Sequence, residues 1–152
     1  VPVEFAYQWY RGATAIGGAT QPSYRVQPAD KGARLVLRVT GSKTGYAGAT
    51  RKSRATRKVA AGTLTTAKPK ISGTAKVGTT LTAKPGKWKP AGVTLTYQWY
   101  RSGKKIGAAT GTSYVLTAKD KGRKITVKVT GKKSGYTTVS KASKATAKVA
   151  KK

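Results

Sequence analysis

One pentapeptide occurs twice in the chain, and this repetition constrains the fold more than any other feature. Tyr7-Gln8-Trp9-Tyr10-Arg11 returns 90 positions later as Tyr97-Gln98-Trp99-Tyr100-Arg101. The match continues without a gap, at the same offset of 90, between residues 3–62 and 93–152. A gapless match of this length predicts two copies of one folded unit.

Apolar and polar residues alternate through the second copy of the pentapeptide. The residues at 93, 95, 97 and 99 are apolar, and those at 94, 96 and 98 are polar. A period of two predicts a β-strand whose successive side chains point to opposite faces. We therefore expect Tyr97 and Trp99 in a core, and Gln98 and Tyr100 on the outer face.

The same reasoning predicts further strands around Ile71 and over 80–83, 113–116, 124–130 and 136–149, with glycine and proline turns about every ten residues. In the last of these, alternation places Ala145, Ala147 and Val149 opposite Lys144, Thr146 and Lys148. Many short strands with one buried tryptophan are typical of an immunoglobulin-like sandwich. The predicted fold class is all-β, with two tandem immunoglobulin-like β-sandwiches.

The two copies differ at their front. Residues 68–92 have no counterpart before Val1, so the first copy is expected to lack its N-terminal strands. We expect an incomplete repeat at 1–62, a linker at 63–67, a complete repeat at 68–150 and a basic tail at 151–152. Two explanations stay open: the chain is a fragment of a longer protein, or another chain supplies the missing strands by β-strand addition. The absence of methionine favours a processed product or an excised fragment.

A set of turn, core and loop residues extends through nearly the whole chain: Pro69, Ile71-Ser72-Gly73, Val77-Gly78, Leu81, Pro85-Gly86, Trp88, Tyr97-Gln98-Trp99, Gly103, Ile106, Ala109-Thr110, Tyr114, Asp120, Gly122, Val129-Thr130-Gly131 and Gly135-Tyr136. In these residues the chain resembles the bacterial immunoglobulin-like repeats that occur in tandem in secreted and surface proteins, particularly of actinobacteria. The resemblance implies a secreted or cell-surface location and a non-catalytic accessory role. It also implies that Trp88 packs across one end of the sandwich rather than binding a sugar.

The residue inventory argues against an enzyme. The chain has no histidine, no cysteine and only three acids, which leaves no acid–base pair, thiol nucleophile, metal centre or cofactor site to expect. Asp30 and Asp120 occupy equivalent turns, and we expect each to cap its own turn.

Thirty-two Lys and Arg against three acids give a net charge of +29. Such a charge favours an anionic partner, although solubility and protection of strand edges also explain basic outward positions. Tyrosines beside outward basic residues predict a polyanion-binding face on each copy. Its predicted residues are Gln8, Tyr10, Arg34, Arg38, Arg54 and Lys58 in the first copy and Gln98, Tyr100, Lys124, Lys128, Lys144 and Lys148 in the second.

The sequence therefore predicts a cationic module that attaches a secreted or surface protein to an anionic cell-wall polymer, an acidic polysaccharide or a nucleic acid. The alternative is a structural spacer or filament subunit, completed by strand addition from a neighbour and self-associating through the open edge of the first repeat. No membrane span is expected, because no apolar run is long enough.

Overall fold

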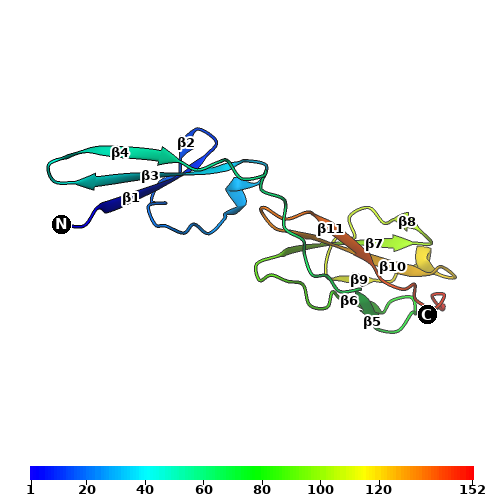
Figure 1. The fold of residues 1–152 in the computed structure, drawn as a ribbon. Coiled ribbons are helices and arrows are strands. Elements are labelled where there is room, and N and C mark those ends of the chain that lie inside the picture. Colours follow the sequence, from blue (N-terminus) through cyan, green and yellow to red (C-terminus); the bar gives the residue numbers. More distant parts are fainter. The chain divides into compact units, whose positions relative to one another are not determined.

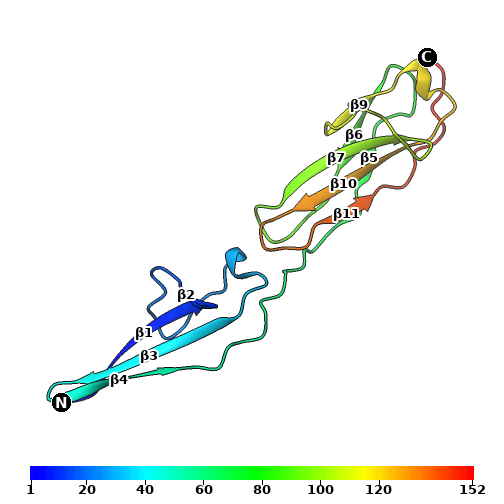
Figure 2. The same cartoon turned by 90° about the horizontal axis from the view of Figure 1, so that it is seen from above.

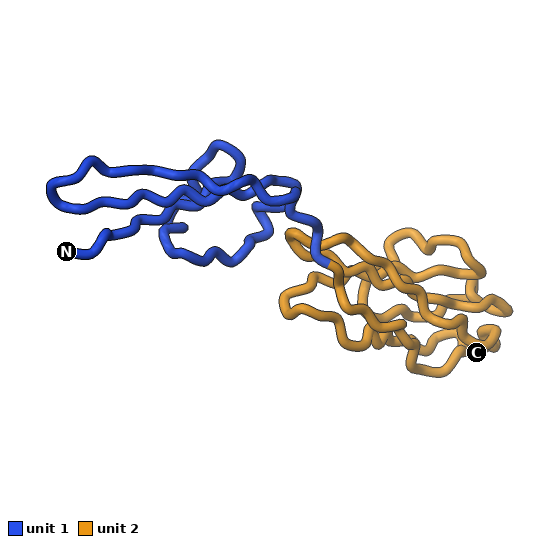
Figure 3. Tube along the Cα trace, viewed as in Figure 1, with its two compact units in different colours: residues 1–62 blue, residues 63–152 orange.

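The computed structural model describes all 152 residues and divides them into two compact units, Val1–Gly62 and Thr63–Lys152 (Figure 3). Both units are built from β-strands, and the only helical elements are two single 3-10 turns, η1 (Pro28–Asp30) and η2 (Ala118–Asp120). The predicted all-β class is therefore confirmed. The chain contains no helix of the length and apolar character needed to cross a membrane.

Unit 1 contains a single four-stranded antiparallel sheet. Its strands are β1 (Glu4–Arg11), β2 (Thr14–Ala15), β3 (Leu35–Lys43) and β4 (Tyr46–Lys52), in the order β2-β1-β3-β4. Figure 2 shows β1, β3 and β4 as one layer. β1 and β3 pair over their whole length, from Glu4 opposite Ser42 to Arg11 opposite Leu35.

Unit 2 contains two antiparallel sheets that face each other (Figure 1). One has the order β11-β10-β7-β8, from β7 (Thr94–Arg101), β8 (Lys104–Lys105), β10 (Ile125–Lys132) and β11 (Val139–Ala142). The other has the order β5-β6-β9, from β5 (Lys70–Ser72), β6 (Thr80–Lys84) and β9 (Ser113–Val115). This arrangement is consistent with a β-sandwich.

The core of unit 2 lies between the two sheets. Trp99 of β7 and Val127 of β10 are fully buried, and they pack with Leu81 of β6. The predicted alternation is confirmed on β10, where Ile125, Val127 and Val129 are buried while Lys128 is exposed. Burying these side chains supplies the hydrophobic stabilisation that holds the two layers together.

Elements of the two units correspond at the offset of 90. β1 corresponds to β7, β2 to β8, η1 to η2 and β3 to β10. No strand among residues 1–62 corresponds to β5 or β6.

The segment 63–67, assigned to a linker from the sequence, is grouped with unit 2 in the structure. Leu64 is only 5% exposed. The backbones of Thr65 and Lys89 exchange two hydrogen bonds, each of 3.0 Å. These contacts join the segment to the loop that follows β6.

The last strand is shorter than predicted, and the predicted alternation over 144–149 is wrong. β11 ends at Ala142, and every third residue of the chain then makes a backbone hydrogen bond, Ser143 and Thr146 to β10 and Val149 to Arg123 just before β10. The Ser143 hydroxyl accepts a 3.0 Å hydrogen bond from the Val127 amide. Ala145 and Ala147, predicted to face inward, are exposed. The spacing is three rather than two because the amides of Val127 and Ile125 donate to the hydroxyls of Ser143 and Thr146, and not to backbone carbonyls as in a regular strand pair.

Candidate polyanion-binding surface

A tyrosine and a lysine lie together on the outer face of the four-stranded sheet of unit 2. The Nζ atom of Lys128 lies 5.4 Å from the centre of the Tyr100 ring. Tyr100 is on β7 and pairs with Lys105 of β8, whose exposed side chain adds a second cation near the ring. Contact between a cation and an aromatic face is attractive and leaves the lysine charge available to an anion. Lys105 is not among the residues predicted from the sequence.

Unit 1 repeats this arrangement with arginine in place of lysine. The guanidinium carbon of Arg38 lies 4.6 Å from the centre of the Tyr10 ring. Arg38 is opposite Lys52 in the pairing of β3 with β4, so two cations adjoin on this face. The Nε atom of Arg38 is buried and has no hydrogen-bond partner. A planar guanidinium held against an aromatic ring is suited to bidentate contact with phosphate or carboxylate.

The two glutamines predicted for this face have their amides engaged by loops of the chain. The Gln98 amide donates to the carbonyl oxygen of Ile106 at 2.7 Å and to that of Ala109 at 3.2 Å. The Gln8 amide donates in the same way to the carbonyl of Ile16 at 2.8 Å. The geometry therefore makes Gln8 and Gln98 loop-positioning residues, and the tyrosine–cation pairs are the parts of the face open to a ligand.

Two more of the predicted residues precede the long strands. Lys124 comes directly before β10 and is exposed, on the same outward phase as Lys128. Its counterpart Arg34 comes directly before β3, and its guanidinium donates to the Thr56 carbonyl at 3.0 Å. Lys124 and Arg34 therefore add a further positive charge to the faces that carry Lys128 and Arg38.

The other four predicted residues lie in the period-three segments that follow β4 and β11. Arg54, Lys58, Lys144 and Lys148 are all exposed. Because these segments do not alternate as a strand does, the four side chains do not project from the same sheet face as Tyr10 and Tyr100. Lys144 lies on a groove with Lys68 and Lys70, next to β5 of the opposite sheet. The structure therefore does not group Lys144 with Tyr100.

An open hollow of about 870 Å³ lies between β8 and β9 of unit 2. Lys105 and Lys119 contribute to its lining, together with Tyr114 and the loop 106–111. Lys105 thus lies between this hollow and the Tyr100 ring. A polymer lying across β8 could contact both features.

The two aspartates are buried within hydrogen-bond networks that the sequence predicted only in part. Asp120 accepts a 2.7 Å hydrogen bond from the Thr117 amide, which confirms the predicted turn cap. It also accepts from the Tyr114 hydroxyl at 2.8 Å and forms an ion pair with Arg101. Asp30 repeats this network with Tyr24, Arg11 and the Gln27 amide. The signal was available, because the arginine, tyrosine and aspartate are identical in both copies.

These networks keep both aspartates ionised. Burial alone would raise the pKa of Asp120, but hydrogen bonds from Thr117, Arg101 and Tyr114 outweigh it, so the pKa lies below its ordinary value of 3.8. The pKa of Asp30 is lowered for the same reasons. Burial, then the hydrogen bond to Asp120, raises the pKa of Tyr114. Each aspartate neutralises one arginine and is inaccessible to a ligand.

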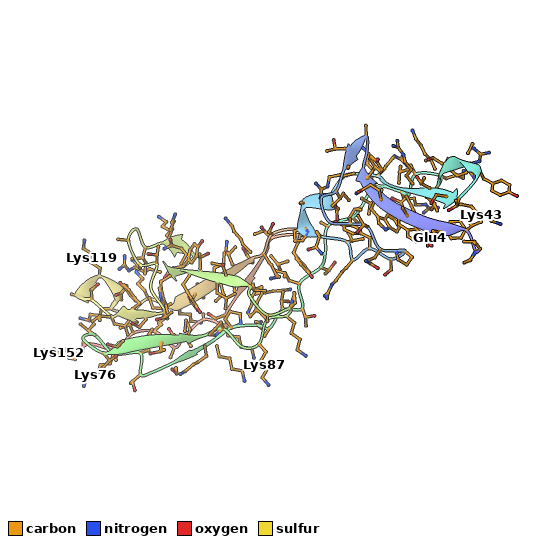
Figure 4. The ribbon with its side chains drawn as sticks, turned by 90° about the vertical axis from the view of Figure 1, so that its left-hand side faces the viewer. Glu4, Lys43, Lys76, Lys87, Lys119 and Lys152 are labelled. Atoms are coloured by element: carbon orange, nitrogen blue, oxygen red, sulfur yellow. The ribbon has the colours of Figure 1, made fainter.

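Nearly all of the positive charge therefore has no acidic partner. Only Arg11 and Arg101 form ion pairs, which leaves 30 of the 32 basic residues without an acidic partner. The one remaining acid, Glu4, is exposed. Figure 4 shows Lys76, Lys119 and Lys152 at one end of unit 2 and Lys87 at its other end.

Comparison with known proteins finds no family model that matches the chain and no curated protein similar to it.

Proposed function

We propose that the chain is a non-catalytic, cationic accessory module that attaches a secreted or surface protein to an anionic polymer. The observation that carries this proposal is the set of 30 basic side chains without an acidic partner. Only a polyanion or salt relieves the mutual repulsion of so many like charges, and a polyanion gains affinity by releasing its counterions. The polymer classes with suitable chemistry are anionic cell-wall polymers, acidic polysaccharides and nucleic acids.

The fold that accompanies this proposal is a tandem pair of immunoglobulin-like sandwiches, the first without its front strands. Two facing sheets around the buried Trp99 support it for unit 2. The correspondence of β1, η1 and β3 with β7, η2 and β10 supports it for unit 1. The resemblance to bacterial immunoglobulin-like repeats supports an extracellular location.

The proposal is tested by retention on heparin and on polyphosphate columns. We expect the full chain to bind both at about 50 mM salt and to elute only at high salt, because phosphate and sulfate contacts weaken steeply with ionic strength. Failure to bind either polymer at about 50 mM salt refutes the proposal, since electrostatic affinity is greatest there.

A pair of matched variants tests whether the tyrosine–cation face is used. The first double variant, Lys105→Gln/Lys128→Gln, removes two positive charges beside Tyr100. The second, Lys76→Gln/Lys87→Gln, removes the same charge from the ends of unit 2. A contribution of the face predicts earlier elution for the first variant. Equal elution of the two variants refutes use of the face and leaves the total charge as the cause of binding.

Replacing Tyr10 and Tyr100 tests whether the anionic partner is a nucleic acid or a polymer without bases. Base stacking on an aromatic side chain contributes about 1–3 kcal/mol per base. Tyr10→Leu with Tyr100→Leu should therefore weaken binding to single-stranded DNA about tenfold or more, and leave binding to polyphosphate unchanged. An equal loss on both polymers contradicts stacking.

A further inference from the structure

The hollow between β8 and β9 of unit 2, which we call the β8–β9 hollow, has two lysines in its lining and no acid. Lys105 is on β8 and Lys119 is in η2, and both side chains are exposed. Asp120, which follows Lys119 in the chain, is fully buried and forms its ion pair with Arg101. The β8–β9 hollow therefore carries a net positive charge and attracts an anionic group.

Arg101 adds a hydrogen-bond donor whose position is fixed. Its Nε atom donates to the Asp120 carboxylate, and its Nη2 atom donates to the Tyr114 hydroxyl at 3.2 Å. The Nη1 atom makes no hydrogen bond within the chain, and the side chain, which is 25% exposed, lines the hollow. A guanidinium that two partners already hold loses little freedom when it binds an oxyanion.

The backbone of β9 borders the hollow with an unpaired edge. β9 is the last strand in the order β5-β6-β9, so only one of its edges is paired within the sheet. Thr112 and Leu116 form backbone hydrogen bonds of 2.8 and 2.9 Å with the segment that contains β6. Because bonded and non-bonded residues alternate in an antiparallel pair, Ser113 and Val115 direct their amides and carbonyls away from β6. Both residues line the hollow.

The rest of the lining is largely apolar. Val115 is 55% exposed, and Ile106 and Ala109 lie beside it in the lining. The volume of about 870 Å³ falls within the roughly 300–1,000 Å³ of small-molecule sites, which combine apolar walls with a few polar groups. A sugar ring matches this lining, because one of its faces consists of C–H groups and its edge consists of hydroxyls.

The free carbonyls of β9 favour a sugar over a phosphate or sulfate chain. A carbonyl oxygen only accepts hydrogen bonds, so it needs a donor from the ligand. A sugar hydroxyl donates and accepts, and it can therefore satisfy both the carbonyls and the amides of Ser113 and Val115. Ionised phosphate and sulfate groups only accept, and they leave the carbonyls without a partner.

We propose that the β8–β9 hollow binds a carboxylated sugar unit of an acidic polysaccharide. The sugar carboxylate contacts Lys105, Lys119 and the Nη1 atom of Arg101. The apolar face of the ring lies on Val115, and the ring hydroxyls pair with the free backbone groups of Ser113 and Val115. This assignment rests on the attachment function proposed above and narrows its polymer to one class.

Unit 1 differs at the positions that carry the site. Lys105 and Lys119 correspond to Ala15 and Ala29 at the offset of 90, and the apolar Val115 corresponds to Arg25. Unit 1 thus lacks both lysines of the pair. The site belongs to unit 2, and the equivalent residues of unit 1 provide an internal reference.

The experiment titrates the isotope-labelled full chain with a tetramer of galacturonic acid. The salt concentration is about 0.15 M, where charges more than about 8 Å apart are largely screened. We expect saturable changes in the amide signals of Ser113 and Val115, and none at the equivalent Ser23 and Arg25. A tetramer of galactose, which has no carboxylate, should bind at least tenfold more weakly. Polyphosphate of similar charge should leave the signals of Ser113 and Val115 unchanged.

Matched variants test the two lysines. Lys105→Ala/Lys119→Ala introduces the residues of unit 1 and should weaken galacturonate binding at least fivefold. Lys104→Ala/Lys121→Ala is the control, because it removes the same charge from exposed neighbours that do not line the hollow. This control should weaken binding less than twofold. The galactose tetramer tests the same contact in the unmodified protein.

Three results overturn the sugar site. They are equal signal changes at Ser113 and Ser23, displacement of galacturonate from Ser113 and Val115 by polyphosphate, and equal binding by the two double variants. Any of them together with retention on the heparin and polyphosphate columns removes the sugar site and leaves the attachment function in place. Absence of binding to the columns and to galacturonate refutes both.

Discussion

Replacing Asp120 with asparagine should destabilise unit 2 strongly. The carboxylate has no exposed surface and accepts hydrogen bonds from Arg101, Tyr114 and Thr117. An asparagine amide has one acceptor and one donor group. Because the Arg101 side chain and the Thr117 amide are donors only, either orientation of the new amide places two donors together.

The magnitude follows from the burial of the pair. Removing one partner of a buried ion pair costs about 3–5 kcal/mol. The Arg101 side chain is 25% exposed, so the lower figure applies. For a domain of this size, about 3 kcal/mol lowers the midpoint of thermal unfolding by roughly 12–24 °C. This is a large part of the roughly 5–15 kcal/mol by which domains are stable.

The assay is urea unfolding of the full chain, with exchange of the Val127 amide reporting on unit 2 alone. Glu4→Gln is the control, because it removes the same charge from an exposed acid without an ion pair, and it should change stability by less than about 0.5 kcal/mol. A loss of less than about 1 kcal/mol for Asp120→Asn, or an equal loss for Glu4→Gln, refutes the reasoning.

The same variant predicts a pH dependence. The pKa of Asp120 lies below its ordinary value of 3.8 in the folded chain, so the ionised carboxylate stabilises the fold above that pH. This stabilisation is lost as the pH falls through the folded pKa, because the carboxyl must then bind a proton. The difference in stability between the parent chain and Asp120→Asn should therefore narrow at acid pH. A difference that stays constant down to pH 2 contradicts the assigned ion pair.

Two more pairs of variants use the internal repeat as a control. Gly131→Ala should destabilise unit 2 by about 1–3 kcal/mol, because the new methyl group collides with Trp88. The equivalent Gly41→Ala should have little effect on the stability of unit 1. Equal losses of stability in the two units would contradict the difference in space around the two glycines. Ser143→Ala should cost about 1–3 kcal/mol, because it leaves the buried Val127 amide without its acceptor. The equivalent Ser53→Ala should cost less, because Ser53 is exposed. Urea unfolding of each variant measures both pairs.

The strands and the core of unit 2 were predictable because they depend on local alternation. Period two over 93–101 and 124–130 correctly identified the buried Trp99 of β7 and the buried Ile125, Val127 and Val129 of β10, whereas Tyr97 is only partly buried against the core. The tyrosine–cation pairs also follow in part, since Tyr100 and Lys128 were assigned to one outer face. Their neighbours Lys52 and Lys105 were missed, because strand register, and not alternation, determines which residues lie side by side.

The ion pairs and the period-three segments were missed for a different reason. Arg101 and Asp120 are 19 residues apart, and no local pattern indicates that a strand end meets a particular turn. In the segment after β11, alternating alanines and lysines suggested a strand, whereas the hydroxyl residues that determine its path recur every third position. Ser143 and Thr146 recur as Ser53 and Thr56 in the first copy, which is the signal that could have identified them.

The period-three segment has a consequence for the way unit 2 meets its neighbours. A β-strand recruits another strand because its free amides and carbonyls point sideways at every second residue. Along 143–149 the inward contacts come at every third residue instead, through Ser143, Thr146 and Val149, so no regular row of free groups remains. The segment 143–149 therefore offers no regular template for intermolecular strand pairing, independently of its charge. Lys144 and Lys148 are therefore not needed there as guards against aggregation, and their charge is available for contacts with other molecules.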